Sequence, residues 1–222
     1  MKKILLIFLL TIVFIILFFL FVLAQPQGYQ ENGRLAIYFQ GEQVGFEEYR
    51  WVELKQTYIL EVEGQLTKPV PMVIEHLQII LDSSFIPQKF ELRGTISGVR
   101  QEISSELRDG QVINLIRVAG QEQTLSQKIR RDALLLPNPI FSPYLVLAKK
   151  FRCRLSVKPE PQEISIYVIP QVELKATIQP EETDPCWLLI HLGSTEVRLK
   201  TNPQGELLSL TIPSQRLEVV QD

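Results

Sequence analysis

The sequence predicts a mainly β protein. The expected fold is one curled antiparallel meander, a barrel or half-barrel, with one short helix near residues 142–152 and an N-terminal apolar signal or anchor helix. Apolar and polar residues alternate with a period of two along most of the chain, and short turns rich in glycine, asparagine and proline separate the alternating runs. The run LLLPNPIFSPYLVLAKKF at 134–151 breaks this alternation and spaces its later apolar residues by three and four, which predicts the helix.

The N-terminus predicts export from the cytoplasm. Lys2 and Lys3 precede a run of 21 uncharged residues from Ile4 to Ala24, which is the pattern of a secretory signal. At about 1.5 Å per residue the run would span roughly 31 Å, long enough to stay in the membrane as an anchor. The aliphatic Val22 and the small Ala24 also suit cleavage by signal peptidase. Residues 1–24 are therefore predicted as a signal peptide or a signal anchor, and both alternatives stay open.

The remaining residues, 25–222, are predicted to form a single β-rich exported domain. Lysines precede the apolar run and none follows it directly, which places this domain outside the cytoplasm. The protein is expected in the periplasm, or anchored to the cytoplasmic membrane through residues 4–24. A proline-rich connector at 158–163 marks a possible weak boundary inside the domain.

The charge of the chain argues against nucleic acid as a partner. Its 23 basic and 25 acidic residues give a net charge of −2. Past the N-terminus, basic residues are adjacent only at Arg130–Arg131 and Lys149–Lys150, so no basic stripe follows a phosphate backbone.

About eight strands are predicted before the interrupting segment. Gly41 and Gly45 suit a turn and a bulge between the first two, while Pro69 and Pro71 limit where the fourth begins. The expected runs are Arg34 to Gln40, Val44 to Leu54, Tyr58 to Leu66, Val73 to Leu81, Phe90 to Ile96, Ile103 to Leu107, Val112 to Val118 and Thr124 to Ile129. A meander of this length must curl because twist accumulates, and its concave face needs something to fill it.

The interrupting segment is predicted to fill that concave face. Its prolines at 137 and 139 cannot continue a strand ladder. Ser142 as the cap and Pro143 as the first helical residue would begin the helix.

The helix at 142–152 would carry one apolar stripe, formed by Tyr144, Leu147, Ala148 and Phe151. The basic residues Lys149, Lys150 and Arg152 are expected in water. Two interpretations stay open. The segment is a fixed part of the core, or it is a movable plug over an apolar cavity with Tyr144, Leu147 and Phe151 as ligand-binding residues.

About six further strands are predicted to complete the same sheet. The stretch Asn202-Pro203-Gln204-Gly205 is a turn, since proline presets φ and glycine accepts a positive φ. The expected runs are Ile164 to Ile169, Val172 to Ile178, Trp187 to Leu192, Thr195 to Thr201, Leu207 to Ile212 and Arg216 to Val220.

Cys153 and Cys186 are the two cysteines of the chain, 33 residues apart. Their spacing fits neither a metal knuckle nor a redox CxxC motif. In an oxidising compartment a disulfide is possible, and it would join the end of the interrupting segment to the strand beginning at Trp187. Two unpaired thiols remain the alternative.

Three stretches carry a resemblance to a family: Phe39 to Glu47, Asn138 to Lys150, and Val168 to Gln171. They resemble exported bacterial proteins grouped as domain of unknown function 3108, over nearly all of the mature chain. The role of that family is unassigned, so the resemblance implies an exported β-barrel-like domain and no catalytic residues. In outline the chain is also similar to half-barrels with a helical lid of the lipoprotein-carrier type, at the level of fold alone.

Catalytic and metal-binding motifs are not found in the sequence. His76 and His191 are the two histidines, and neither stands in an HExxH or GxSxG setting. The acidic run at 181–184 offers too few regularly spaced oxygens for calcium. The chain is therefore expected not to be an enzyme and to need no cofactor or metal.

Two functions are predicted from these observations. The first is a non-catalytic exported protein of the cell envelope that binds a lipid or another hydrophobic ligand in the concave face of the sheet. The alternative is a structural or assembly factor that binds another envelope protein. It would do so through edge strands or through exposed aromatic residues, for which the candidates are Tyr38, Phe46, Tyr49 and Trp51.

Overall fold

The computed structural model describes residues 28–153, 160–170 and 172–222. The predicted signal or anchor at 1–24 and the start of the connector at 158–163 lie outside these ranges. Among the helices within them, none has the length and apolar character needed to cross a membrane.

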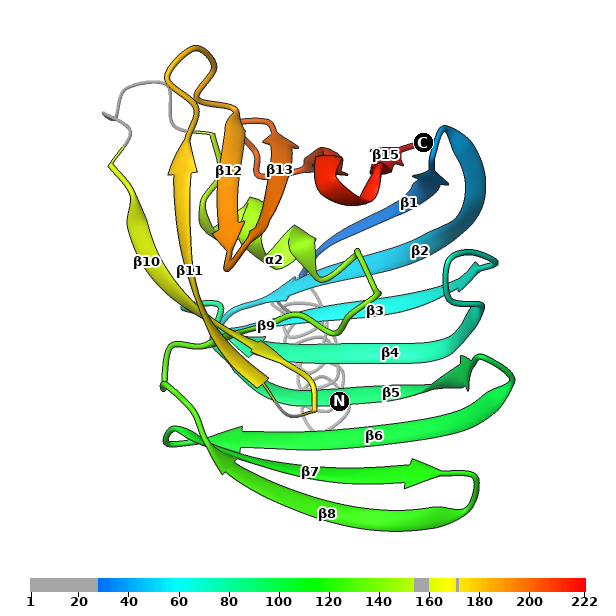
Figure 1. Cartoon of the computed structure of the whole chain (residues 1–222). Coiled ribbons are helices and arrows are strands. Elements are labelled where there is room, and N and C mark those ends of the chain that lie inside the picture. The colour runs from blue at the N-terminus through cyan, green and yellow to red at the C-terminus, as the bar shows by residue number, and fades with distance from the viewer. Residues whose placement is uncertain (1–27, 154–159, 171) are drawn as a thin grey trace, which may run out of the picture.

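Two antiparallel meanders join in a single sheet (Figure 1). The first contains β1 (Tyr29–Phe39), β2 (Glu42–Leu54), β3 (Thr57–Leu66), β4 (Met72–Asp82), β5 (Pro87–Ile96), β6 (Val99–Arg108), β7 (Gln111–Val118) and β8 (Gln121–Lys128). The second contains β10 (Gln162–Val168), β11 (Val172–Pro180), β12 (Trp187–Leu192), β13 (Thr195–Thr201), β14 (Leu207–Ile212) and β15 (Leu217–Gln221). A 3₁₀ turn, η1 (Pro213–Gln215), separates the last two strands.

The two meanders meet where β1 pairs with β15, with Leu35 opposite Gln221 and Phe39 opposite Leu217. The mainly β fold and the two runs of strands are confirmed. The sheet is curled but not closed, because its ends are β8 and the two-residue β9 (Leu134–Leu135). The sequence did not predict β9, which pairs with β10 in parallel.

The concave face holds the core, because alternate residues of each strand point inward. On β2 these inward positions are Trp51, Tyr49 and Glu47. Tyr49 and Trp51 are only 3% and 0% exposed, so the prediction that they form an exposed aromatic surface is wrong. Tyr38 and Phe46 are half-buried, and the guanidinium of Arg34 covers the ring of Phe46 at 4.2 Å.

The end of the sheet at β9 and β10 is held against the arm formed by β6 and β7. Asn114 on β7 is fully buried and donates from Nδ2 to the hydroxyl of Tyr167 on β10 (2.8 Å) and to the carbonyl of Pro170 (3.0 Å). Its own oxygen accepts from the hydroxyl of Ser105 on β6 (2.6 Å). A satisfied polar cluster therefore ties the second meander to the first across the interior.

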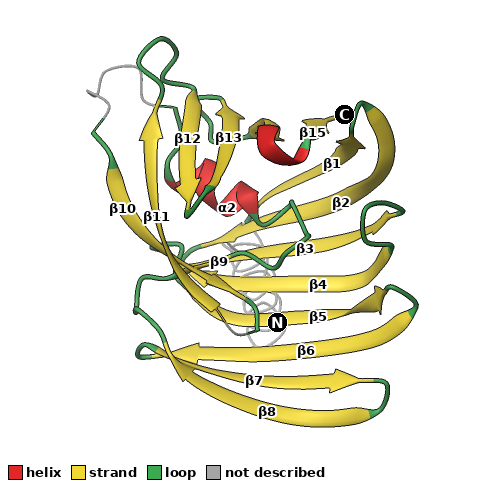
Figure 2. Cartoon of the chain, viewed as in Figure 1, coloured by secondary structure: helices red, strands yellow, loops and turns green. Residues whose placement is uncertain are grey.

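The helix α2 (Tyr144–Lys150) lies inside the curl of the sheet (Figure 2). It is shorter than the predicted 142–152, and it begins after Pro143, which stands at the N-cap position without a side-chain cap. The prediction that Ser142 caps the helix is wrong, because its hydroxyl donates a hydrogen bond to a carboxylate on β2 instead.

Candidate functional site

The segment inside the curl, residues 134–153, is called the plug segment below. Every residue of α2 from Tyr144 to Ala148 is buried, and Leu145, Leu147 and Ala148 are 0% exposed. The sequence predicted that only one stripe of this helix would be buried. In the structure these five consecutive residues, which cover all sides of the helix, are buried, as expected where strands surround it.

Glu47 fixes the start of the plug segment. Its carboxylate is 1% exposed and accepts hydrogen bonds from the backbone N–H of Phe141 (2.9 Å to Oε1) and of Ser142 (2.6 Å to Oε2). The hydroxyl of Ser142 adds a third donor at 2.5 Å. These donors belong to the turn before α2, so Glu47 positions that turn against β2 by satisfying groups that would otherwise be buried without partners.

Burial raises the pKa of Glu47 above its ordinary value, because desolvation penalises the charged form. The hydrogen bonds from Ser142 and Phe141 act in the opposite direction but do not cancel this effect.

Lys149 fixes the other end of α2. Its ammonium bonds the carboxylate of Glu31 on β1 at 2.5 Å, and the two side chains are 7% and 10% exposed. The prediction that Lys149 lies in water is therefore wrong, because an acidic residue on the concave face receives it. Glu31 also accepts from the hydroxyl of Tyr49 (3.3 Å), whose ring lies where Gly33 has no side chain.

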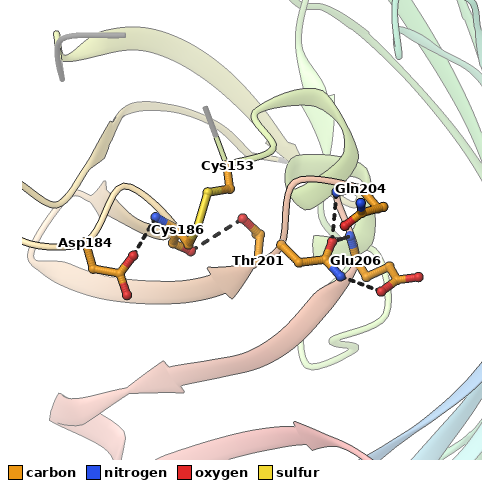
Figure 3. Close-up of a disulfide and its surroundings, with 7 residues drawn as sticks. Cys153, Asp184, Cys186, Thr201, Gln204 and Glu206 are labelled. Carbon is orange, nitrogen blue, oxygen red and sulfur yellow. Dashed lines mark hydrogen bonds between the residues drawn. A yellow bond between two sulfur atoms is a disulfide. The ribbon is translucent and has the colours of Figure 1, made fainter. Parts of the chain in front are cut away.

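A disulfide between Cys153 and Cys186 follows directly after the helix (Figure 3). The carbonyl of Cys186 accepts the backbone N–H of Thr201 at 2.8 Å, and Asp184 accepts the N–H of Cys186 at 2.9 Å. The bond therefore connects the end of the plug segment to a turn that is itself tied to β13.

The turn after β13 packs on the same end of α2. Gly205 has φ of +80° and lies so close that a Cβ on it would stand 3.0 Å from the Cα of Lys149. Asn202 accepts the N–H groups of Gln204 and Glu206 through its side chain (Figure 3). The predicted glycine turn is confirmed, and its close approach to the helix is an additional reason for glycine there.

The plug segment leaves an apolar cavity of about 340 Å³ on the side of its prolines. Its walls come from the plug segment, both meanders and η1, and no charged side chain lies among its described lining residues. The polar members of the lining are Asn138, Thr195, Gln215 and Tyr144. Val172 and Leu174 are 48% and 38% exposed and belong to the more open part of the wall.

Among the polar residues that line the cavity, Tyr144 is the buried one. It is 8% exposed, and its hydroxyl makes no hydrogen bond to any residue in the described ranges. Burial raises the pKa of Tyr144 to about 12, so the hydroxyl keeps its proton and remains a donor at neutral pH.

The three residues predicted to bind a ligand are separated by the structure. Tyr144 lines the cavity, but Leu147 and Phe151 are not in its lining. Leu147 is 0% exposed, and Phe151 is half-buried against the core near the far end of α2. The plug segment is held at Glu47, at Glu31 and at the disulfide, and the cavity lies beside it.

Sequence reasoning missed Glu47, and a signal for it was present. Glu47 and Glu48 are adjacent on β2 and point to opposite faces, so Glu47 is buried and Glu48 is exposed. Glu47 lies two and four positions before Tyr49 and Trp51, so it points to the same apolar face of the strand. An acidic side chain on that face needs buried hydrogen-bond donors.

The remaining candidate groups form no reactive cluster. Within 28–153, 160–170 and 172–222, no group of three or more His, Cys, Asp or Glu side chains could hold a metal ion. His191 is exposed, and His76 lines an open groove bordered by charged residues of β1, β2 and β3.

The chain matches no family model, no curated protein and no solved structure.

Proposed function

We propose that this protein is a non-catalytic exported protein of the cell envelope that binds a hydrophobic ligand, such as a lipid or acyl chain. The apolar cavity beside the plug segment carries the proposal. Its 340 Å³ lies at the low end of the range for small-molecule sites, which favours a slim molecule such as a single acyl chain.

The lining also favours one polar feature in the ligand. Tyr144 lines the cavity and its hydroxyl donates to no described residue, so a ligand oxygen would give this hydroxyl an acceptor. An uncharged or weakly polar head with one acceptor fits a lining that has amide and hydroxyl groups but no charges.

The location proposed is the periplasm or the outer face of the cytoplasmic membrane. It is supported by Lys2, Lys3 and the apolar run up to Ala24 in the sequence, and by a disulfide, which persists in an oxidising compartment.

The experiment is binding of an environment-sensitive apolar fluorophore to the purified protein, followed by displacement with a fatty alcohol. Leu192→Trp adds volume at the cavity wall and is expected to abolish displaceable binding. Leu189→Trp is the matched control, since Leu189 is on the same strand, β12, but outside the lining. Equal binding by the two variants, or no displaceable binding by the wild type, would contradict the proposal.

Tyr144→Phe tests the polar feature. It is expected to weaken a fatty alcohol about five-fold, the effect of one hydrogen bond of about 1 kcal/mol, and to leave a plain hydrocarbon unchanged.

The alternative function, an assembly factor for another envelope protein, loses two of its four aromatic contacts because Tyr49 and Trp51 are buried. What favours it is an open edge strand, β8, whose partner is considered next.

A further inference from the structure

The two ends of the sheet are protected very differently. At one end, β9 is two residues long, and Leu134 and Leu135 are only 2% and 3% exposed. At the other end, β8 is eight residues long, mostly exposed, and pairs only with β7 within the described chain. Figure 1 shows β8 at the lower margin of the sheet with no described element beyond it.

β8 lacks two of the devices that blunt an edge, a bulge and a proline, and its charged side chains, Glu122 and Lys128, stand near its ends. Its pairing with β7 runs without a bulge from Val118 opposite Gln121 to Gln111 opposite Lys128, and the strand contains no proline. Natural edge strands are commonly shortened, bulged or interrupted by proline to prevent further pairing. An intact edge of this length is therefore suited to receive another strand.

The geometry of the β7–β8 turn fixes which backbone groups are free. Ala119 and Gly120 have φ of 49° and 82°, a two-residue turn of type I′ whose flanking residues are hydrogen-bonded to each other. The N–H and C=O groups of odd-numbered residues of β8 therefore face β7, as the bond from Ile129 N to Gly110 O (2.9 Å) also shows. The groups of Glu122, Thr124, Ser126 and Lys128 face away from the sheet.

We propose that a second copy of this chain pairs with β8 in antiparallel fashion, about a two-fold axis that passes through Leu125. In this register Glu122 lies opposite the partner's Lys128, and Thr124 lies opposite the partner's Ser126. The charge pair occurs twice, and about eight backbone hydrogen bonds form.

The charges of β8 are complementary to a reversed copy of the same strand, which is the reason for choosing this partner. Glu122 and Lys128 stand near opposite ends and point to the same face. Glu122 already pairs with Arg117 through Oε2 at 2.7 Å, which leaves its other oxygen for the copy.

The two neighbouring registers pair the residues of β8 less favourably. Antiparallel partners must present outward-facing groups to each other, so the register shifts in steps of two residues. With Thr124 on the axis, Lys128 would face the turn residue Gly120. With Ser126 on the axis, Glu122 would face Arg130, whose backbone N–H is already bonded to Glu173 at 2.9 Å.

The first test is a cysteine scan of the full chain, solubilised in mild detergent and oxidised gently. Leu125→Cys is expected to give a covalent dimer on a non-reducing gel. Facing residues at a non-hydrogen-bonded position have Cα atoms about 4.5 Å apart, within reach of a disulfide. Thr124→Cys and Ser126→Cys are expected to give little dimer, because each then lies diagonally from its own copy. No cross-link at Leu125, or a stronger one at either neighbour, would overturn the proposal.

The second test is co-purification of two differently tagged full-length copies. Thr124→Pro removes an outward N–H and leaves the β7–β8 ladder intact, so it is expected to reduce co-purification at least about ten-fold. Thr124→Val keeps the N–H and is expected to behave as wild type. Self-association that survives Thr124→Pro would show that it uses another surface. A monomer whose β8 captures a different protein would assign the edge to that protein, and either result would refute pairing between copies.

Discussion

Glu47→Leu should destabilise the fold more than any change at the neighbouring Glu48. The substitution leaves the backbone N–H groups of Phe141 and Ser142 buried without an acceptor, where the wild type holds them at 2.9 and 2.6 Å. Each such group costs about 1–3 kcal/mol, or about 2–6 kcal/mol for the pair. Removing a buried carboxyl that is itself costly to desolvate offsets part of this loss, which places the expected decrease in the free energy of unfolding at about 2–4 kcal/mol.

Urea unfolding followed by tryptophan fluorescence measures this decrease. With an m value of about 2–3 kcal/mol per molar urea, the midpoint should fall by about 1 M. Glu48→Leu is the matched control, because that side chain is 57% exposed and pairs only loosely with Arg34 at 3.5 Å; its effect should stay within about 0.5 kcal/mol. Hydrogen exchange should locate the loss at the amides of Phe141 and Ser142. Equal midpoints for the two leucine variants would show that Glu47 does not hold the plug segment.

Two further predictions concern pH and the disulfide. Because burial raises the folded-state pKa of Glu47 above its unfolded value, its stabilising contribution is full below the unfolded pKa, near pH 4, and falls as pH rises through the folded pKa. The stability of wild type relative to Glu47→Gln should therefore decline from pH 4 upward in urea titrations, and an advantage that grows with pH would contradict the raised pKa. Replacing both Cys153 and Cys186 by serine should lower the free energy of unfolding by about 3–4 kcal/mol, given their sequence separation of 33. A midpoint equal to that of the unreduced wild type would exclude a stabilising role for the bond.

The sheet was largely predictable because its signal is local. A period of two, bounded by turns such as Ala119-Gly120 and Asn202 to Gly205, identifies a strand without any knowledge of its neighbours. The strand β9 gave no such signal, because two residues cannot show a period and both Leu134 and Leu135 are buried.

The candidate site was less predictable because its parts lie far apart in the sequence. Lys149 looked like a solvated residue at the end of a helix, and only the fold places Glu31, 118 residues earlier, beside it. Ser142 looked like a helix cap, and Glu47, 95 residues earlier, takes its hydroxyl. A cavity is also a property of three-dimensional packing, so the sequence could predict candidate lining residues such as Tyr144 but not which of the candidates face empty space.

The pairing of β1 with β15 has a consequence for the order in which the molecule can assemble. Each meander can form its own hairpins locally, but Leu35 finds Gln221 only after nearly the whole described chain is present. A chain that leaves the ribosome or crosses a membrane N-terminus first therefore carries β1 with one side unpaired until the residues after Leu217 follow. During that interval the first meander has an open flank at β1 as well as at β8, and the protein is most exposed to mispairing before its final strand arrives.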